Sequence, residues 1–463
     1  MTSPLPAEIF KAYDIRGIVD KTLTPAVVQR IGQALGTLAL ERRCDTIAVG
    51  RDGRLSGSML SAALIDGIRS SGANVIDLGQ VATPMTYFAA HQLNTRCSVM
   101  LTGSHNPPDY NGLKMVIAGE TLSGVAIQAL RERIERNDLR AAAALGTLTT
   151  KDIASTYIDR IVGDIRLKRP FSIVVDAGNG VAGAFAPMLY ERLGCKVTAI
   201  FCEVDGHFPN HHPDPSQPKN LQTLIKRVQQ ENAELGLAFD GDGDRLGVVT
   251  RGGDIIYPDR QLMLFAADVL KRVPGATIIY DVKSTRLLNP WIRERGGAPL
   301  MCQTGHSFVK AKMKETGAQL AGEMSGHTFF GERWYGFDDG LYAGARLLEI
   351  LSQHADPSAV LNALPDSTST PELALACARE GDQHALIARL QKEARFPDAK
   401  EIILIDGLRV EYEDGFGLAR ASNTTPTVVL RFEADNDKAL QRIQRDFREQ
   451  LRAVAGGEME LPF

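Results

Sequence analysis

The sequence predicts an α/β protein of several domains that ends in a smaller α+β unit. Short apolar or β-branched runs alternate with amphipathic helical segments over about the first 350 residues, which is typical of parallel sheets joined by crossover helices. The 463 residues are about three times the length of an average domain, so we expect three or four hydrophobic cores. About the last hundred residues differ, because their apolar runs resemble antiparallel strands set among helices.

The first unit contains two expected strands, 46–49 and 97–101. Between them, the spacing of apolar residues predicts a helix near 59–68, and Gly72 is well placed to end that helix. We expect a boundary near residue 150, which makes 1–150 the first domain.

The second unit opens with the expected strand 172–176 and ends at a glycine-rich break, so we place a domain at 151–253. A third unit repeats the order of strand, polar loop and helix. Its expected strands are 276–280 and 300–303, and it forms a domain at 254–366.

The last unit, 367–463, is the expected α+β domain. Its predicted strands are 401–405 and 427–432, and its predicted helices cover about 382–395 and 437–454.

The composition is that of a globular protein, with 44% hydrophobic and 23% charged residues. Lys and Arg total 52 against 56 Asp and Glu, a formal charge of −4, so we expect neither a nucleic acid nor a membrane surface as partner. We expect a cytoplasmic protein, because no apolar run approaches the roughly 18 residues that span a bilayer and the first residues do not resemble a signal peptide. The six cysteines form no CxxC pair and predict reduced, mostly buried thiols.

The sharpest motif is Asp240-Gly241-Asp242-Gly243-Asp244-Arg245, directly after the apolar run 235–239. Three carboxylates at alternate positions repel one another unless a cation holds them, and the glycines let the backbone turn tightly. An EF-hand is excluded, because its sixth and twelfth positions hold Arg245 and Arg251 rather than Gly and Glu. The all-oxygen set favours magnesium or calcium, and the alternative is a solvated acidic turn.

A second motif, Thr102-Gly103-Ser104-His105-Asn106-Pro107-Pro108, follows the expected strand 97–101. In α/β sheets, ligand sites lie beyond the carboxyl ends of strands, so Ser104 is a candidate nucleophile with His105 beside it. The motif lacks the G-x-S-x-G pattern of hydrolases, which disfavours a Ser-His-Asp enzyme. Read alone, it is equally an ordinary turn.

A third motif, Arg420-Ala421-Ser422-Asn423-Thr424-Thr425, concentrates donors suited to a phosphate dianion. The segment Gly322-Glu323-Met324-Ser325-Gly326-His327 offers a carboxylate and a hydroxyl that could bind sugar hydroxyls. Adjacent His211 and His212 lack helical metal-ligand spacing and predict a rigid proline-rich loop. Further candidates at strand ends are Arg16, Lys283 and His306.

These four motifs occur in the order seen in the α-D-phosphohexomutases, and the chain most resembles the bacterial phosphomannomutase/phosphoglucomutases. The resemblance extends over the whole chain, from Ala12-Tyr13-Asp14-Ile15-Arg16-Gly17 onward. It implies three related α/β domains and a fourth, TATA-binding-protein-like domain around a central cleft. It also implies that Ser104 is carried as phosphoserine.

The resemblance further assigns residue roles. Asp240, Asp242, Asp244 and a phosphoserine oxygen of Ser104 would bind Mg²⁺, and Arg420, Ser422, Asn423 and Thr424 would grip the substrate phosphate. Glu323 and Ser325 correspond to sugar-hydroxyl contacts. The remaining cleft residues would be Arg16, His105, Lys114, Arg245, Lys283 and His306, with His105 and Lys114 as proton-transfer groups.

The implied reaction is the reversible interconversion of hexose 1-phosphate and hexose 6-phosphate, with mannose or glucose as the sugar. It would pass through a bisphosphate, and glucose 1,6-bisphosphate or its mannose equivalent would serve as activator. Sugar phosphates are the expected partners, and the lack of a coiled-coil repeat favours a monomer.

Three alternatives remain at this point. Phosphoglucosamine mutase usually has Gln where Met324 stands and a serine-rich start to its phosphoserine loop. A non-catalytic calcium- or sugar-phosphate-binding protein would leave His105 and Lys114 unexplained. A phosphatase would release inorganic phosphate at the rate of isomer formation.

Overall fold

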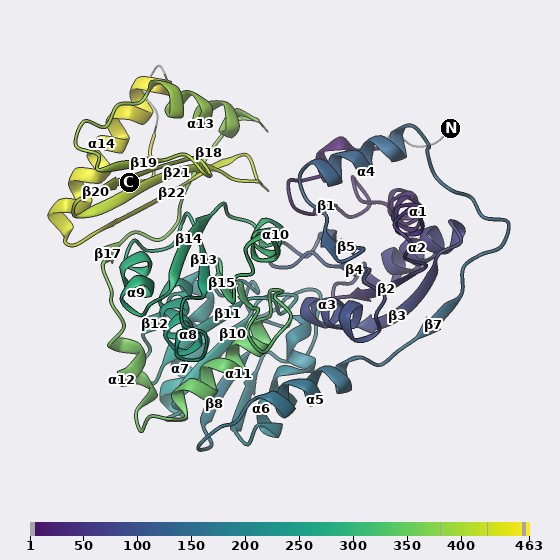
Figure 1. Ribbon diagram of the computed structural model, residues 1–463, viewed down its shortest axis with the longest axis horizontal. Coiled ribbons are helices and arrows are strands. Elements are labelled where there is room, and N and C mark those ends of the chain that lie inside the picture. Colours follow the sequence, from purple (N-terminus) through teal and green to yellow (C-terminus); the bar gives the residue numbers. More distant parts are fainter. Residues whose placement is uncertain (1–4, 380, 424, 456–459) are drawn as a thin grey trace.

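A computed structural model describes residues 5–379, 381–423, 425–455 and 460–463. These residues form four β-sheets with helices packed against them. In Figure 1 the first sheet lies at the upper right, the fourth at the upper left, and the second and third fill the lower part.

The first sheet has seven strands in the order β1-β5-β4-β2-β3-β7, with β6 paired to β5. Its helix α1 begins where the Thr24 hydroxyl accepts a hydrogen bond from the Val27 amide and Pro25 takes the first helical position. Gly72, at φ +93°, follows the end of α2, as predicted. The elements are β1 (Ile15–Ile18), α1 (Pro25–Glu41), β2 (Thr46–Arg51), α2 (Gly57–Ser70), β3 (Asn74–Gln80), α3 (Thr83–Gln92), β4 (Ser98–Leu101), β5 (Tyr110–Ile117), β6 (Glu120–Thr121), α4 (Val125–Glu135) and β7 (Leu148–Thr150).

The second sheet has five strands in the order β12-β11-β10-β8-β9. Its elements are α5 (Ala154–Asp164), β8 (Ser172–Asp176), α6 (Ala186–Arg192), β9 (Lys196–Ile200), α7 (Gln222–Gln230), β10 (Leu235–Phe239), β11 (Leu246–Thr250) and β12 (Ile255–Ile256). Short 3₁₀ helices, η1 (Ala7–Ile9), η2 (Val181–Ala184) and η3 (Pro218–Leu221), occur in the first two units.

The third sheet has four strands in the order β14-β13-β15-β16. Its elements are α8 (Pro258–Arg272), β13 (Thr277–Asp281), α9 (Leu288–Glu294), β14 (Ala298–Cys302), α10 (His306–Thr316), β15 (Leu320–Gly322), β16 (Thr328–Phe330), α11 (Gly340–Leu351) and α12 (Pro357–Asn362).

The fourth sheet is antiparallel and has six strands, in the order β17-β22-β21-β20-β19 with β18 paired to β22. The predicted α+β character of this unit is confirmed, although the expected strand 401–405 ends at Ile403, and half-exposed Leu404 and Ile405 lead into a bend. The elements are β17 (Thr368–Ser369), β18 (Leu373–Ala376), α13 (Asp382–Glu393), β19 (Glu401–Ile403), β20 (Leu408–Tyr412), β21 (Gly415–Ala421), β22 (Thr427–Ala434) and α14 (Asp437–Ala455).

The α/β prediction for the first three units is confirmed, and their sheets contain antiparallel strands beside the expected parallel ones. Each sheet pairs parallel central strands and adds an antiparallel neighbour: β5 beside β4, β11 beside β10, and β16 beside β15. Buried strands of either direction present similar apolar runs, so sequence periodicity does not distinguish them.

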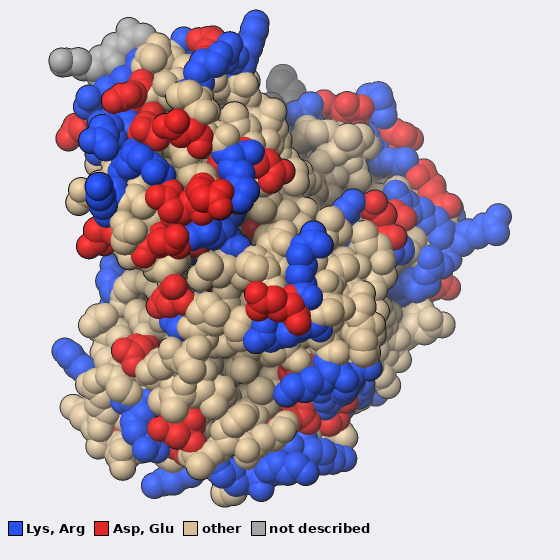
Figure 2. Space-filling view, turned by 60° about the vertical axis from the view of Figure 1, so that its left-hand side comes forward, with Lys and Arg blue, Asp and Glu red and all other residues tan. Residues whose placement is uncertain are grey.

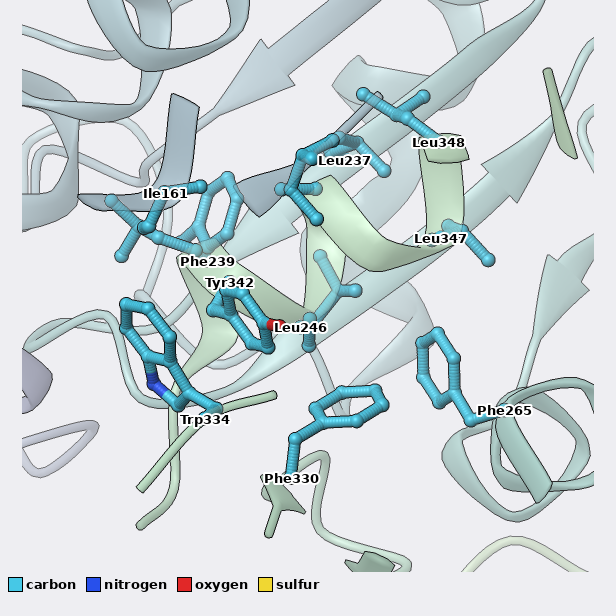
Figure 3. Close-up of a cluster of buried hydrophobic side chains, with 14 of the residues drawn as sticks. Ile161, Leu237, Phe239, Leu246, Phe265, Phe330, Trp334, Tyr342, Leu347 and Leu348 are labelled. Carbon is cyan, nitrogen blue, oxygen red and sulfur yellow. The ribbon is translucent and has the colours of Figure 1, made fainter. Parts of the chain in front are cut away.

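The largest hydrophobic cluster joins the second and third sheets and includes side chains of α3. Figure 3 shows Phe265, Phe330, Trp334 and Tyr342 gathered around Leu246. The Trp334 and Tyr342 rings stack with centroids 4.1 Å apart, and the Phe265 and Phe330 rings meet edge to face at 5.1 Å. This shared core gives the second and third sheets a common hydrophobic support.

The distribution of surface charge and the state of the cysteines agree with the expectations from the composition. Figure 2 shows Lys and Arg side chains intermingled with Asp and Glu over the visible face. All six cysteines are free thiols, four of them buried, as predicted. Among the described helices, none combines the length and the apolar character that crossing a bilayer requires.

Candidate active site

The predicted functional loops occupy equivalent places in the sheets. In the three α/β sheets, each loop joins a central strand to its antiparallel neighbour. Loop 102–109 joins β4 to β5, loop 240–245 joins β10 to β11, and loop 323–327 joins β15 to β16. Of the predicted phosphate-binding residues, Arg420 lies on β21, and Ser422 and Asn423 begin the connection from β21 to β22 of the fourth sheet. A connection between two antiparallel strands therefore contributes residues to the site in each of the four units.

Side chains from all four units line one cavity of about 200 Å³. The three predicted aspartates are fully buried, with Asp240 in contact with Ser104, and Thr424 falls outside the described residues. The predicted site residues that line the cavity are Arg16, Ser104, His105, Lys114, Arg245, Lys283, His306, Glu323, Ser325, Arg420, Ser422 and Asn423.

Ser104 lies against the acidic loop of the second unit. Its Oγ donates a hydrogen bond of 3.0 Å to Oδ2 of Asp240, and the residue is 1% exposed. The backbone of Ser104 has φ +48°, a left-handed conformation that a non-glycine residue rarely adopts. A Cβ added to Gly241 would lie 2.3 Å from the Ser104 carbonyl oxygen, so the acidic loop approaches Ser104 this closely because of its glycine.

Asp240, Asp242 and Asp244 each turn a carboxylate oxygen to a common point, with these oxygens within 4.8 Å of one another. Burial and the two neighbouring carboxylates raise the pKa of Asp240 well above its usual value. Within the described part of the chain, Oδ1 of Asp242 is buried and accepts no hydrogen bond, and Oδ1 of Asp244 lies 3.2 Å from Nε2 of His327. Three carboxylates that repel one another, with one oxygen unpartnered, fit a divalent cation with a preference for oxygen, and Mg²⁺ is such an ion.

Lys114 on β5 reaches into the same cluster. Its Nζ lies 2.7 Å from Oδ2 of Asp242 and 2.5 Å from Oδ2 of Asp244. Burial would lower the pKa of Lys114, but the two carboxylates outweigh it and raise that pKa above its ordinary value. Ion pairs between Lys114 and the acidic loop therefore connect the first unit to the second.

Two further polar groups flank Ser104. The ring Nδ1 of His105 lies 3.4 Å from Oδ2 of Asp214, and Nε of Arg245 lies 3.7 Å from Oδ2 of Asp240. Burial, together with the Arg245 guanidinium, lowers the pKa of His105 to about 4, against the opposing effect of Asp214. The imidazole is therefore neutral at pH 7 and is a weaker base than an ordinary histidine.

The third unit presents a carboxylate held in one orientation. Oε1 of Glu323 accepts a hydrogen bond of 2.6 Å from the Gly305 amide, and Oε2 lies 3.1 Å from Nδ1 of His327. The Ser325 hydroxyl lies 3.1 Å from the same imidazole nitrogen. Such fixed acceptors suit recognition of sugar hydroxyl groups.

Cations from three units face the remainder of the cavity. Arg420 donates through Nε to Oδ2 of Asp406 at 2.9 Å, and Nζ of Lys283 lies 2.6 Å from Oε1 of Glu372. Arg16 pairs through Nη2 with Oδ2 of Asp14 at 2.5 Å. These cations fit an anionic ligand because they face one cavity, although Nη1 of Arg16 already bonds Gly103 O and Oδ1 of Asn106.

Several cavity residues escaped prediction from the sequence, namely Tyr13, Asp214, His327 and Glu372. His327 is the last residue of the motif 322–327, so the sequence contained a reason to predict it. Asp214 follows the histidine pair predicted as a rigid loop. His211 does serve structure there, because its Nε2 lies 3.0 Å from Oδ1 of Asp176.

A larger groove of about 960 Å³ lies between α3 and β6 of the first unit and α10 of the third. His91 stacks on Tyr335 there, with ring centroids 5.0 Å apart. The groove's lining contains none of the predicted site residues, so the chemistry belongs to the smaller cavity.

Comparison with known proteins adds a family match in each unit. The chain matches phosphoglucomutase/phosphomannomutase alpha/beta/alpha domains I, II and III over residues 7–141, 155–253 and 257–368. The C-terminal domain of the same family matches residues 372–450.

Curated relatives match nearly the whole chain. It is 61% identical over 441 residues to a phosphoglucomutase of Neisseria meningitidis, covering 95% of this chain and 96% of the relative. It is 57% identical over 460 residues to a phosphomannomutase/phosphoglucomutase of Pseudomonas aeruginosa, covering 99% and 98%. A crystal structure of a phosphoglucomutase/phosphomannomutase family protein from Burkholderia thailandensis superposes with a TM-score of 0.94, at 56% identity, covering 99% of this chain and 100% of that one.

Proposed function

The chain belongs to the phosphoglucomutase/phosphomannomutase family, and from this premise we propose that it reversibly interconverts hexose 1-phosphates and hexose 6-phosphates, with glucose or mannose as the sugar. The observation that carries the proposal is the contact of the Ser104 hydroxyl with Asp240 inside a cavity lined by cations. A nucleophilic hydroxyl, a cation-binding carboxylate cluster and several phosphate-binding groups are the parts that phosphoryl transfer requires.

Ser104 carries the phosphoryl group in this proposal. As phosphoserine it holds about −1.5 to −2 charges at pH 7. When bound at Asp240, Asp242 and Asp244, Mg²⁺ supplies charge neutralisation and polarises the phosphoryl oxygens. Arg245, beside Asp240, stabilises negative charge on the phosphoryl group as it passes to the sugar.

In the first half-reaction, a hydroxyl of the bound hexose phosphate attacks the phosphoserine phosphorus. The bond from phosphorus to Ser104 Oγ breaks, a bond from phosphorus to the sugar oxygen forms, and the hydroxyl proton passes to a base. His105 and Lys114 are the two predicted proton-transfer groups, and both line the cavity. The product is a hexose 1,6-bisphosphate.

In the second half-reaction, the bisphosphate turns end over end and returns its other phosphoryl group to Ser104. Arg420, Ser422, Asn423 and Thr424 grip whichever phosphate is not reacting. Glu323 and Ser325 meet the sugar hydroxyls between the two ends. Arg16, Lys283 and His306 complete the binding surface. An added glucose 1,6-bisphosphate therefore acts as activator by loading Ser104.

Each domain contributes one part in this proposal. Domain 1–150 carries the phosphoserine, 151–253 the metal ligands, 254–366 the sugar contacts and 367–463 the phosphate-binding residues. We propose that the chain acts as a cytoplasmic monomer, which light scattering and cell fractionation test. The relatives' names do not favour phosphoglucosamine mutase, the alternative within the same chemistry.

One assay tests the activity. The purified protein, with Mg²⁺ and catalytic glucose 1,6-bisphosphate, is given glucose 1-phosphate, mannose 1-phosphate and glucosamine 1-phosphate in parallel. We expect 6-phosphate isomers from glucose or mannose, with Ser104→Ala inactive. Release of inorganic phosphate at the rate of isomer formation would identify a phosphatase instead, and turnover of glucosamine phosphate alone would identify the phosphoglucosamine enzyme.

A further inference from the structure

Arg54 lies beneath the Ser104 loop. It follows strand β2 and is 3% exposed, and the cavity lining does not include it. Its guanidinium donates four hydrogen bonds, all to backbone carbonyls of the 102–110 segment. Nη2 bonds Ser104 O at 2.8 Å and Asn106 O at 2.6 Å, and Nη1 bonds Pro107 O at 2.5 Å and Tyr110 O at 2.8 Å.

Three of these carbonyls, those of Ser104, Asn106 and Pro107, lie in the loop, and the fourth, that of Tyr110, lies at the start of β5. Of the three loop carbonyls, Pro107 O also accepts the Tyr110 amide, whereas no described backbone amide donates to Ser104 O or Asn106 O. A buried carbonyl without a donor is costly, so the loop needs an outside source of hydrogen bonds. A planar guanidinium supplies several donors in a fixed geometry, whereas the single ammonium of lysine cannot span four acceptors in the same way. One side chain thus fixes the path of the loop at four points.

Asp52 completes this support from the same end of β2. Its Oδ2 accepts hydrogen bonds from the Thr102 hydroxyl at 2.7 Å and from the Gly103 amide at 3.2 Å. Its Oδ1 accepts from the Arg54 amide at 3.0 Å, and Nε of Arg54 lies 3.4 Å from Oδ2. Asp52 therefore holds the residues before Ser104, and Arg54 holds Ser104 and those after it.

The packing leaves the loop little room to move. A Cβ added to Gly103 would lie 2.3 Å from Cζ and from Nε of Arg54, so the guanidinium packs directly against the Gly103 backbone. On the other side, the Ser104 carbonyl packs against Gly241 of the acidic loop. Ser104 meanwhile keeps its strained φ of +48°, which persists only where surrounding contacts fix it.

We propose that Arg54 is a positioning residue for phosphoryl transfer: it holds the carbonyls around Ser104 so that Oγ faces the carboxylates of the acidic loop. The inference rests on the proposed function, since it assigns Arg54 a part in the reaction at Ser104. Arg54 acts through Ser104 and does not touch the cavity, so its loss should affect the transfer step rather than substrate binding.

The main test compares Arg54→Lys with Arg69→Lys. Arg69 is a matched control, because it lies in the same domain, is half-buried and also donates to a backbone carbonyl, that of Gly146. In Arg54→Lys we expect kcat to fall about a hundredfold, the loss that a misplacement of about 1 Å can cause, with KM within about twofold of wild type. Thermal unfolding of both variants is recorded, and kcat is compared at a temperature where each is fully folded, because Arg54→Lys leaves buried carbonyls without donors. A kcat within threefold of wild type, or an equal loss of kcat in both variants, would overturn the inference.

A second variant covers the case in which Arg54→Lys fails to fold. Gly103→Ala keeps Arg54 but places a methyl group against its guanidinium, so kcat should fall at least about tenfold with little change in KM. Gly163→Ala, on α5, is its control, because the added carbon there meets nothing within 4 Å besides the backbone of its own helix and its chain neighbours. Wild-type kcat in Gly103→Ala would contradict the inference.

Phosphorylation separates this inference from the proposed function. Each protein is incubated with glucose 1,6-bisphosphate, and intact mass gives the phosphoryl occupancy before single-turnover transfer to glucose 6-phosphate is timed. If wild type takes up no phosphoryl group at Ser104, the proposed function fails. If wild type does so and Arg54→Lys transfers it equally fast, only the positioning role of Arg54 fails.

Discussion

The hydroxyl of Ser104 donates a 3.0 Å hydrogen bond to Oδ2 of Asp240, a residue 136 positions away in the sequence. The bond joins the first and second units at the loops that follow β4 and β10. Each loop connects a central strand to its antiparallel neighbour. The contact between Ser104 and Asp240 therefore depends on a strand arrangement that both units share.

Metal removal should abolish most of the activity. If the cation contributes ~4 kcal/mol to transition-state stabilisation, chelation or Asp242→Asn should lower kcat by roughly a thousandfold. Added Mg²⁺ should restore the chelated wild type but not the variant, as a coupled assay measures. Asp66→Asn, at an exposed position on α2, is the control and should keep wild-type activity. Full activity in a metal-depleted sample would contradict the assignment of the acidic loop.

Arg420→Lys should weaken substrate binding more than it slows the reaction. Lysine keeps the charge but loses the planar fork that binds a phosphate through two donors, and it loses the bond from Nε to Asp406. We expect KM to rise about tenfold with a smaller change in kcat, measured by steady-state kinetics on glucose 1-phosphate. Arg442→Lys, which alters a partly exposed pair with Asp414 in the same domain, should leave both constants unchanged. An unaltered KM in Arg420→Lys would remove Arg420 from the phosphate-binding set.

Asp339 should make stability depend on pH. It caps helix α11 and accepts hydrogen bonds from the Tyr157 hydroxyl and the Trp334 indole, yet burial raises its pKa to about 7. A raised carboxyl pKa favours the folded state at low pH, and this contribution is lost as pH rises from the unfolded value near 4 through about 7.

The Asp339→Asn variant isolates this effect, because asparagine can still cap the helix but does not ionise. From pH 5 to pH 8, its free energy of unfolding should gain about 2–3 kcal/mol relative to wild type, measured by urea titration. A difference between the two proteins that is constant over this range would show that Asp339 is ionised throughout.

The shared core predicts a large loss of stability from Phe330→Ala. Phe330 is 1% exposed and contacts Phe265, Tyr342 and the Arg346 guanidinium. Truncation should lower the free energy of unfolding by about 3–5 kcal/mol. The signal is the fluorescence of the two tryptophans, and Leu145→Ala, at a 62% exposed position, is the control. A change below about 1 kcal/mol would mean that the site collapses around the cavity.

Much of the site could be predicted from the sequence because its chemistry lies in short segments. Ser104, the aspartates of 240–245 and Arg420 each follow or precede an apolar strand, and that local order is legible without coordinates. The strand directions were not predictable, since buried strands that run either way carry the same kind of apolar run. The functional loops are nevertheless the connections between each central strand and its antiparallel neighbour.

Other residues could not be predicted because their roles depend on distant partners. Arg54 bonds carbonyl groups, which leave no mark on the sequence of the loop that it supports. Glu372 meets Lys283 across 89 positions, and Asp214 meets His105 from another unit. Buried polar residues of this kind acquire a function only when the fold brings their partners to them.

The central claim is that Ser104 carries the transferred phosphoryl group, and peptide mass spectrometry tests it most directly. After incubation with Mg²⁺ and glucose 1,6-bisphosphate, the wild-type protein should gain one phosphoryl group, located on the peptide that contains Ser104. Ser104→Ala should gain none and should show no turnover. A phosphoryl group on another residue, or full activity in Ser104→Ala, would contradict the account.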